Sequence, residues 1–379
     1  MRSYASESDG RLTADPGRPL LDLASNDYLG LSRQPEVLAA AAAELQASGL
    51  GAGASRLVSG TRPVHQRLEQ ELAGWLGRER ALLFPSGFQA NLAAVAALVD
   101  RHGLVLADRL IHHSLLVGVR ASGARLQRFA HNDVAQLGQR LGQARRSRPQ
   151  QRLLVLVESL YSMEGSSPDL AAIAACCRRH DALLLVDEAH ALGVLGPGGR
   201  GLAHGLAEVA LLCGTFGKAF GSGGAFLAGD ALLADWLLQG SGAFRYTTAL
   251  APPLAAGALA SLHWLRARPG EGESLMAEAR RWRQALVAAG WPPPPGEGPI
   301  LSLALGEDAT ALALQERLER AGLLAVAIRP PTVPQGTARL RLVLRRGLPP
   351  EALEQLLQAL GPGPCAAATS TPSAPPRHA

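Results

Sequence analysis

The chain has 379 residues, of which 47% are hydrophobic, so it can bury a large core and form one large domain with a smaller one. Its net charge is +5 at pH 7, but its arginines are scattered apart from a short run at 145–148, which argues against nucleic-acid binding as its main role. The uncharged stretch from Tyr246 to Leu265 contains two prolines and a histidine, and we interpret it as a buried helix and not as a membrane span.

The four cysteines of the chain limit its redox and metal chemistry. They have no metal-ligand spacing, and the adjacent pair lies on an expected helix, where it is badly placed to form disulfide bonds. We therefore expect no metal site and a cytoplasmic location, where thiols stay reduced. The cysteines are Cys176, Cys177, Cys213 and Cys365.

Two helices are predicted near the start of the chain, over residues 35–48 and 64–76. Between them, residues 49–56 form a loop in which glycines alternate over five positions. Such a loop lets the backbone approach a ligand or a partner subunit closely. The second helix has residues at helical spacing: His65, Leu68, Glu69 and Leu72.

A short buried strand at 81–84 turns directly into a helix that runs to about Val99. Ser86 is well suited to cap this helix. The backbone amides of Gly87 and Phe88 then remain free at the start of the helix, where the helix dipole favours a phosphate group. This turn is therefore a candidate phosphate site.

Further short apolar runs alternate with helical segments along the middle of the chain. This alternation is typical of a mainly parallel sheet covered by helices on both faces, in which ligands bind at the carboxyl ends of the strands. The predicted strands are 104–106, 125–129, 153–157, 183–186 and 209–212. Polar residues follow several of them: Asp108 and His112, Glu158 to Ser162, Asp187 to His190, and Thr215 to Lys218.

Lys218 is the only lysine in the chain, although the sequence holds 37 lysines and arginines together. An arginine suffices wherever a positive charge or a salt bridge is needed, so one retained lysine indicates chemistry that a guanidinium cannot perform. An amine can lose its proton, attack a carbonyl and form a Schiff base. We predict that Lys218 anchors an aldehyde cofactor covalently; the alternative is an exposed lysine retained by chance.

Asp187 and His190 follow the apolar run at 183–186. A carboxylate in this place binds a metal or a cation, or it caps the structure, and the metal interpretation lacks further ligands at a recognised spacing. Beside a Schiff-base lysine the carboxylate has a defined use, because it keeps a pyridine ring protonated and able to accept electrons. His190 would then reach the phenolic oxygen of that ring, and His112 would stack on its face.

Four segments together resemble the signature of the α-oxoamine synthases, pyridoxal-phosphate enzymes that join an amino acid to an acyl thioester with loss of carbon dioxide. The resemblance covers about residues 20–361. It implies the aspartate-aminotransferase-like type I fold, an α/β fold with a mainly parallel sheet in a large domain and a small α+β C-terminal domain. It also implies a homodimer, with residues 51–55 near the interface. The four segments are Ser25–Leu31, Pro85–Asn91, Val186–His190 and Thr215–Lys218.

The resemblance implies a role for each matching residue. Lys218 would form the Schiff base with pyridoxal 5'-phosphate, Asp187 would pair with the pyridine nitrogen, and His190 would contact the phenolic oxygen. His112 would stack on the ring and would complete the catalytic set with Lys218 and Asp187. The other implied contacts are Gly87, Phe88, Ser162 and Thr215 for the cofactor, and Asn26, His112, Thr332 and Arg341 for the substrates, with Arg341 holding the carboxylate of the amino acid.

Two further segments, Phe129–Val134 and Ala327–Pro334, resemble the family member that uses L-alanine and a pimeloyl thioester in biotin biosynthesis. The acyl donor would be pimeloyl-CoA or a pimeloyl carrier protein, and the sequence does not distinguish these two donors. Alternatives are a relative that joins glycine to a short acyl-CoA, a plain aminotransferase, and a basic nucleic-acid-binding protein.

The chain is expected to divide into three structured parts. These are an N-terminal segment at 1–25, a large cofactor-binding domain at 26–265 and a small C-terminal domain at 266–361. Residues 362–379 are rich in proline, alanine, serine and threonine, and we expect them to be disordered.

Overall fold

The computed structural model describes residues 3–7, 10–14 and 17–364, which form two compact units. The larger unit comprises residues 26–162 and 166–273. The smaller unit comprises the described residues before 26, residues 163–165 and those from 274 onward. The domain limits expected from the sequence stay a prediction, and the expected disordered tail lies almost wholly outside the described residues.

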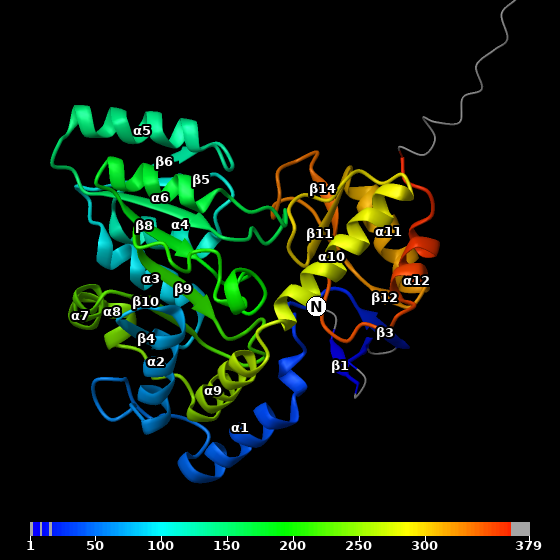
Figure 1. Cartoon of the computed structure of the whole chain (residues 1–379), viewed down its shortest axis with the longest axis horizontal. Coiled ribbons are helices and arrows are strands. Elements are labelled where there is room, and N and C mark those ends of the chain that lie inside the picture. The colour runs from blue at the N-terminus through cyan, green and yellow to red at the C-terminus, as the bar shows by residue number, and fades with distance from the viewer. Residues whose placement is uncertain (1–2, 8–9, 15–16, 365–379) are drawn as a thin grey trace, which may run out of the picture. The chain divides into compact units, whose positions relative to one another are not determined.

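The larger unit is built around a seven-stranded sheet in the order β4-β10-β9-β8-β7-β5-β6 (Figure 1). Strands β5 to β9 pair in parallel, which confirms the mainly parallel sheet predicted from the sequence. Strand β10 runs antiparallel to both of its neighbours and is absent from the predicted strands, because its alanines and glycine are not typical of strands. The strands are β4 (Arg80–Phe84), β5 (Leu104–Asp108), β6 (Arg125–Phe129), β7 (Leu153–Glu158), β8 (Leu183–Asp187), β9 (Val209–Thr215) and β10 (Ala225–Gly229).

The helices of the larger unit begin where local sequence favours a helix start. The first two helices start at Pro35 and Pro63, since proline suits the first position of a helix. Both of these helices confirm the prediction. The helices are α1 (Pro35–Ser48), α2 (Pro63–Leu76), α3 (Gly87–Leu98), α4 (His113–Ser122), α5 (Val134–Ser147), α6 (Leu170–Arg179), α7 (Ala231–Gly240), α8 (Gly242–Arg245) and α9 (Pro252–Ala267), with short 3-10 turns at Leu31–Arg33 and Pro197–Gly199.

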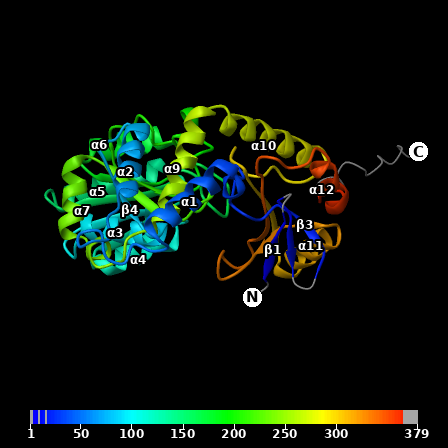
Figure 2. The same cartoon turned by 90° about the horizontal axis from the view of Figure 1, so that it is seen from below.

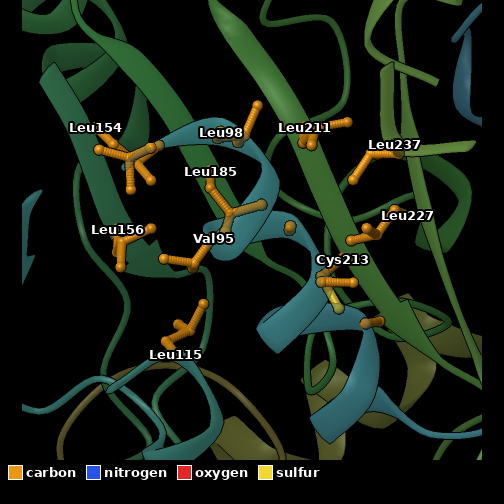
Figure 3. Close-up of a cluster of buried hydrophobic side chains, with 14 of the residues drawn as sticks. Val95, Leu98, Leu115, Leu154, Leu156, Leu185, Leu211, Cys213, Leu227 and Leu237 are labelled. Atoms are coloured by element: carbon orange, nitrogen blue, oxygen red, sulfur yellow. The ribbon is translucent and has the colours of Figure 1, made fainter. Parts of the chain in front are cut away.

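The core of the larger unit lies between the sheet and α3 (Figure 3). Val95 and Leu98 of α3 are buried together with Leu156 and Leu185 of the central strands. Strands β5 and β7 are buried along their whole length, as expected when a sheet is covered on both faces. Their continuous apolar runs therefore reflect two buried faces instead of one.

The stretch from Tyr246 to Leu265 forms most of α9, and the greater part of this helix is buried. This confirms the predicted buried helix. Tyr246 lies before the helix and is exposed. Within the described ranges, no helix combines the length and the apolarity that are needed to span a bilayer.

The smaller unit is α+β, as predicted for the C-terminal part of the chain (Figure 2). One antiparallel sheet has the order β11-β14-β13, and a second sheet has the order β1-β2-β3-β12, in which β12 pairs in parallel with β3. The N-terminal strands therefore belong to the same unit as the C-terminal part of the chain. The elements are β1 (Tyr4–Ser6), β2 (Leu12–Ala14), β3 (Pro19–Asp22), α10 (Glu271–Ala288, which begins in the larger unit), β11 (Ile300–Gly306), α11 (Asp308–Arg320), β12 (Leu323–Leu324), β13 (Val326–Ile328), β14 (Ala338–Val343) and α12 (Ala352–Leu360).

Truncating a central core residue should destabilise the larger unit strongly. We expect Leu185→Ala to lower the free energy of unfolding by about 2–5 kcal/mol, because the side chain is fully buried and its loss leaves a cavity. The matched control is Leu232→Ala on α7, where the leucine is 80% exposed, and its effect should stay within about 0.5 kcal/mol. Denaturant unfolding measures both variants, and equal losses would contradict this description of the core.

Candidate active site

A cavity of about 210 Å³ lies in the larger unit, at the carboxyl ends of β7, β8 and β9. The first turns of α3 and α4 also contribute to its walls. This is the place where a parallel α/β sheet binds its ligand. The lining residues are Gly87, Phe88, Asn91, His112, Ser114, Glu158, Asp187, Ala189, His190, Cys213, Thr215 and Lys218.

Helix α3 presents its N-terminus to the cavity. The side chain of Ser86 caps the helix and accepts a hydrogen bond from the backbone N–H of Gln89 at 3.3 Å. The backbone N–H groups of Gly87 and Phe88 have no hydrogen-bond partner among the described residues. The candidate phosphate site thus offers two free donors at the positive end of a helix dipole.

Asp187 ends β8 and is buried beside the cavity. Its Oδ1 accepts a hydrogen bond from the backbone N–H of Ala189 at 2.9 Å, and its Oδ2 accepts one from Asn91 Nδ2 at 2.7 Å. The carboxylate is therefore fixed in orientation by two donors. Asn91 belongs to the segment that suggested the phosphate site, but its polar side chain is not predicted to contact Asp187.

Lys218 lies in the connection between β9 and β10 and lines the same cavity as Asp187. Hydrogen bonds close this connection, from Gly221 N–H to the Lys218 carbonyl at 2.8 Å and from Phe216 N–H to the Gly224 carbonyl at 2.9 Å. The structure thus brings together the amine and the carboxylate that the sequence predicts as partners.

His112 caps α4 and lines the cavity next to Ser114. Its Nδ1 lies 2.7 Å from Ser114 Oγ, and its backbone N–H donates to Glu158 Oε1 at 2.5 Å. Burial lowers the pKa of His112; the charge of Asp187 opposes this effect and that of Lys218 adds to it. The imidazole is therefore favoured in its neutral form.

His190 also lines the cavity, and its side chain contacts Tyr28. The Tyr28 hydroxyl lies 2.6 Å from His190 Nδ1, and the two rings meet edge to face with centroids 6.2 Å apart. Tyr28 is fully buried. Its contact with His190 is not predicted, because 162 positions separate the two residues in sequence.

Five of the lining residues are missing from the predicted site: Asn91, Ser114, Glu158, Ala189 and Cys213. Glu158 has a visible signal, since it directly follows a predicted strand as Asp187 does. Cys213 has none, because it is part of an apolar run and is almost fully buried. Burial raises the pKa of Cys213 well above its usual value; the charge of Asp187 adds to this rise and that of Lys218 opposes it.

Four predicted residues do not line this cavity. Ser162 and Asn26 belong to the larger unit, and Asn26 Oδ1 lies 3.4 Å from the Tyr28 hydroxyl. Thr332 and Arg341 belong to the smaller unit, where Arg341 is buried on β14. Their assignments as cofactor or substrate contacts stay predictions.

A second polar cluster lies at the end of β5. His131 Nδ1 lies 3.0 Å from Asp108 Oδ1, and its Nε2 lies 2.7 Å from Ser166 Oγ. Asp108 is fully buried and also accepts hydrogen bonds from the backbone N–H groups of Leu110 and Asn132. The cluster therefore ties the segment after β7 to the end of β5.

The residues around the cavity fit a phosphorylated aromatic aldehyde. The helix N-terminus suits a phosphate, the amine of Lys218 suits an aldehyde, and the carboxylate of Asp187 suits a protonated ring nitrogen. The flat imidazole of His112 suits stacking on an aromatic ring, and His190 suits a polar contact with a ring oxygen. In the described part of the chain, no group of acidic, histidine and cysteine side chains has a metal-binding arrangement.

Comparisons with known proteins agree with this chemistry. The aminotransferase class I and II family matches residues 18–360. The 8-amino-7-oxononanoate synthase of Alkalilimnicola ehrlichii is 44% identical over 355 residues, which cover 92% of this chain and 89% of the relative. A solved structure of SPT with a PLP internal aldimine has a TM-score of 0.90 at 28% identity and covers 95% of this chain and 91% of its own. The structure of 8-amino-7-oxononanoate synthase from Francisella tularensis has a TM-score of 0.76 at 28% identity, with coverages of 90% and 96%.

Proposed function

This chain belongs to the aminotransferase class I and II family, and we propose that it condenses L-alanine with a pimeloyl thioester to give 8-amino-7-oxononanoate, carbon dioxide and the free thiol, a step of biotin biosynthesis. It is a pyridoxal-phosphate-dependent acyltransferase. One observation carries the proposal: a single cavity contains the only lysine of the chain, a buried carboxylate and a free helix N-terminus. The choice of substrates is supported by the 44% identical relative.

The residues of the cavity have distinct proposed roles toward the cofactor. Pyridoxal phosphate, when bound, supplies an electron sink for negative charge on the carbon next to the amine. Asp187 would hold the ring nitrogen protonated, and His112 and His190 would contact the ring face and its phenolic oxygen. The phosphate would be bound by the amides of Gly87 and Phe88, with Ser162 and Thr215 as further contacts.

Lys218 has two proposed tasks. Its amine would hold the cofactor covalently and, once released, its Nζ would take the Cα proton of alanine. The Cα would then bond to the thioester carbonyl carbon as the C–S bond breaks and the thiol leaves. The alanine carboxyl group would depart as carbon dioxide, and Cα would take up a proton in its place. Arg341 would hold that carboxyl group, since a guanidinium binds a carboxylate through two hydrogen bonds, and Asn26 and Thr332 would contact the substrates.

Turnover with defined substrates tests the reaction. We expect L-alanine and pimeloyl-CoA, or a pimeloyl carrier protein, to yield 8-amino-7-oxononanoate and carbon dioxide, identified by mass spectrometry and by trapping of the gas. Glycine with acetyl-CoA or succinyl-CoA is the matched comparison, and faster turnover with glycine would overturn the substrate assignment. An amino-group transfer without carbon dioxide would instead identify an aminotransferase.

Removing the amine of Lys218 should abolish covalent cofactor binding. We expect Lys218→Ala to lose the visible absorbance of the bound cofactor and at least about 100-fold in kcat. Lys218→Arg is the matched control, because it keeps the positive charge but cannot form a Schiff base, and it should fail equally. Borohydride reduction of the wild type followed by peptide mass analysis should find the cofactor on Lys218. A cofactor mass on any other residue would contradict the assignment.

We further propose a homodimer in a reducing, cytoplasmic compartment. The three described cysteines are free, which supports a reducing compartment. The loop between α1 and α2 exposes Leu50 and Val58 at 78% and 79%, which supports burial of this loop against a second copy.

Light scattering tests the dimer. We expect a mass about twice the 39.5 kDa of the chain. Val58→Asp should shift the equilibrium toward monomer, because it would place a charge in the apolar interface. The control is Leu232→Asp on α7, which should leave the mass unchanged. A monomeric wild type at micromolar concentration would refute the proposed assembly.

A further inference from the structure

Asn91 and Ser114 form a buried hydrogen-bonded link between Asp187 and His112. Asn91 lies in the first turns of α3, Ser114 lies at the start of α4, and both side chains are almost completely buried. Asn91 Nδ2 lies 2.7 Å from Asp187 Oδ2 and 3.0 Å from Ser114 Oγ. Ser114 Oγ in turn lies 2.7 Å from His112 Nδ1. The proposed reaction gives neither Asn91 nor Ser114 a role.

The direction of these hydrogen bonds follows from which groups carry hydrogens. The carboxylate of Asp187 only accepts, so the amide nitrogen of Asn91 faces it, and the amide oxygen does not. The same nitrogen carries a second hydrogen, which it donates to Ser114 Oγ. Asn91 Oδ1 is buried without a hydrogen-bond partner in the described part of the chain, which is energetically unfavourable. The two contacts of the nitrogen therefore decide how the amide is oriented.

The hydrogen-bond donation from Asn91 to Ser114 determines how Ser114 in turn bonds to His112. Because Ser114 Oγ accepts from Asn91, its own hydrogen is available for His112 Nδ1. The backbone N–H of Ser114 is a second donor, 3.3 Å from the same Nδ1. A ring nitrogen that faces two donors must accept, so the proton of the neutral ring lies on Nε2. No described residue forms a hydrogen bond with Nε2, and His112 lines the cavity.

We propose that Asn91 and Ser114 are positioning residues that fix His112 as the tautomer with its proton on Nε2. The ring then presents a single N–H donor to the cavity, which suits an acceptor oxygen on the bound ligand. The tautomer is independent of the reaction proposed above, and only its use in turnover rests on that proposed function. The same link joins His112 to Asp187, so one amide orients both groups.

The lowered pKa of His112 agrees with a neutral ring. The charged or titratable groups that act on the ring are Asp187, Lys218 and His113. Glu158 accepts a hydrogen bond from the backbone N–H of His112. None of these four groups is altered in the experiments that follow, so a change in the titration of His112 reports on the link itself.

Nitrogen-15 NMR of the full chain measures the tautomer directly, because protonated and unprotonated ring nitrogens resonate in separate regions. Spectra are recorded with and without pyridoxal phosphate, and His112→Gln identifies the resonances by their disappearance. We expect a protonated Nε2 and an unprotonated Nδ1. A proton on Nδ1, or an even mixture of the two tautomers, overturns the proposal without the need for any other variant.

Two variants test whether the link causes this preference. In Ser114→Ala the hydroxyl donor is lost, so we expect the titration midpoint of His112 to rise by about one pH unit and both tautomers to appear. Asn91→Ala should shift the midpoint in the same direction, since Ser114 Oγ is then no longer oriented. The matched control is Ser122→Ala at the other end of α4, where the hydroxyl donates to the Val119 carbonyl, and it should leave His112 unchanged.

Each outcome decides a part of the proposal. An unchanged midpoint in both variants overturns it, and a shift in Ser114→Ala alone overturns the part assigned to Asn91. Thermal unfolding checks that each variant folds; if Ser114→Ala does not, the wild-type spectrum and Asn91→Ala still decide.

Turnover separates this inference from the proposed function. With L-alanine and pimeloyl-CoA, we expect Ser114→Ala to lower kcat about tenfold. If the wild type shows no turnover, the proposed function fails while the tautomer measurement still stands. If the wild type turns over but carries its proton on Nδ1, this inference alone fails.

Discussion

The cavity depends on one buried carboxylate, that of Asp187. A carboxylate that leaves water loses hydration worth roughly several kcal/mol, so it needs donors in the protein. Asp187 has two, the backbone N–H of Ala189 and the side chain of Asn91. One donor comes from the turn after β8 and the other from α3. The carboxylate of Asp187 is therefore fixed in place by the sheet and by the helix that covers it.

The topology of the sheet explains why Lys218 meets this carboxylate. Strands β8 and β9 are parallel neighbours, and Asp187 pairs in register with Cys213. After the carboxyl end of β9, the chain continues through Lys218 before it returns as the antiparallel β10. Because a hydrogen bond from the Phe216 N–H to the Gly224 carbonyl closes this connection, the lysine lies on a short, fixed loop. The antiparallel strand is thus part of what positions the amine.

The sequence predicts those features that depend on local pattern or on the order of strands. The apolar runs predict a parallel sheet, and Asp187 and Lys218 follow two such runs, so their meeting at one edge is predictable. Contacts between side chains of distant segments are not. Tyr28 reaches His190 across 162 positions, and Asn91 reaches Asp187 across 96. Nothing in the sequence around Tyr28 or Asn91 separates these residues from ordinary helix caps or core residues. Their contacts become visible only in the folded chain.

The burial of Cys213 has a consequence for the selectivity of the cavity. A thiolate would compete with an amine for an aldehyde, because both are nucleophiles. Burial raises the pKa of Cys213 well above its usual value, so its sulfur stays protonated and unreactive although it borders the cavity. A carbonyl compound that enters therefore meets the amine of Lys218 without competition from a thiolate at Cys213. Burial by the fold thus prevents the Cys213 thiol from competing with Lys218 for an aldehyde, although the sulfur atom borders the cavity.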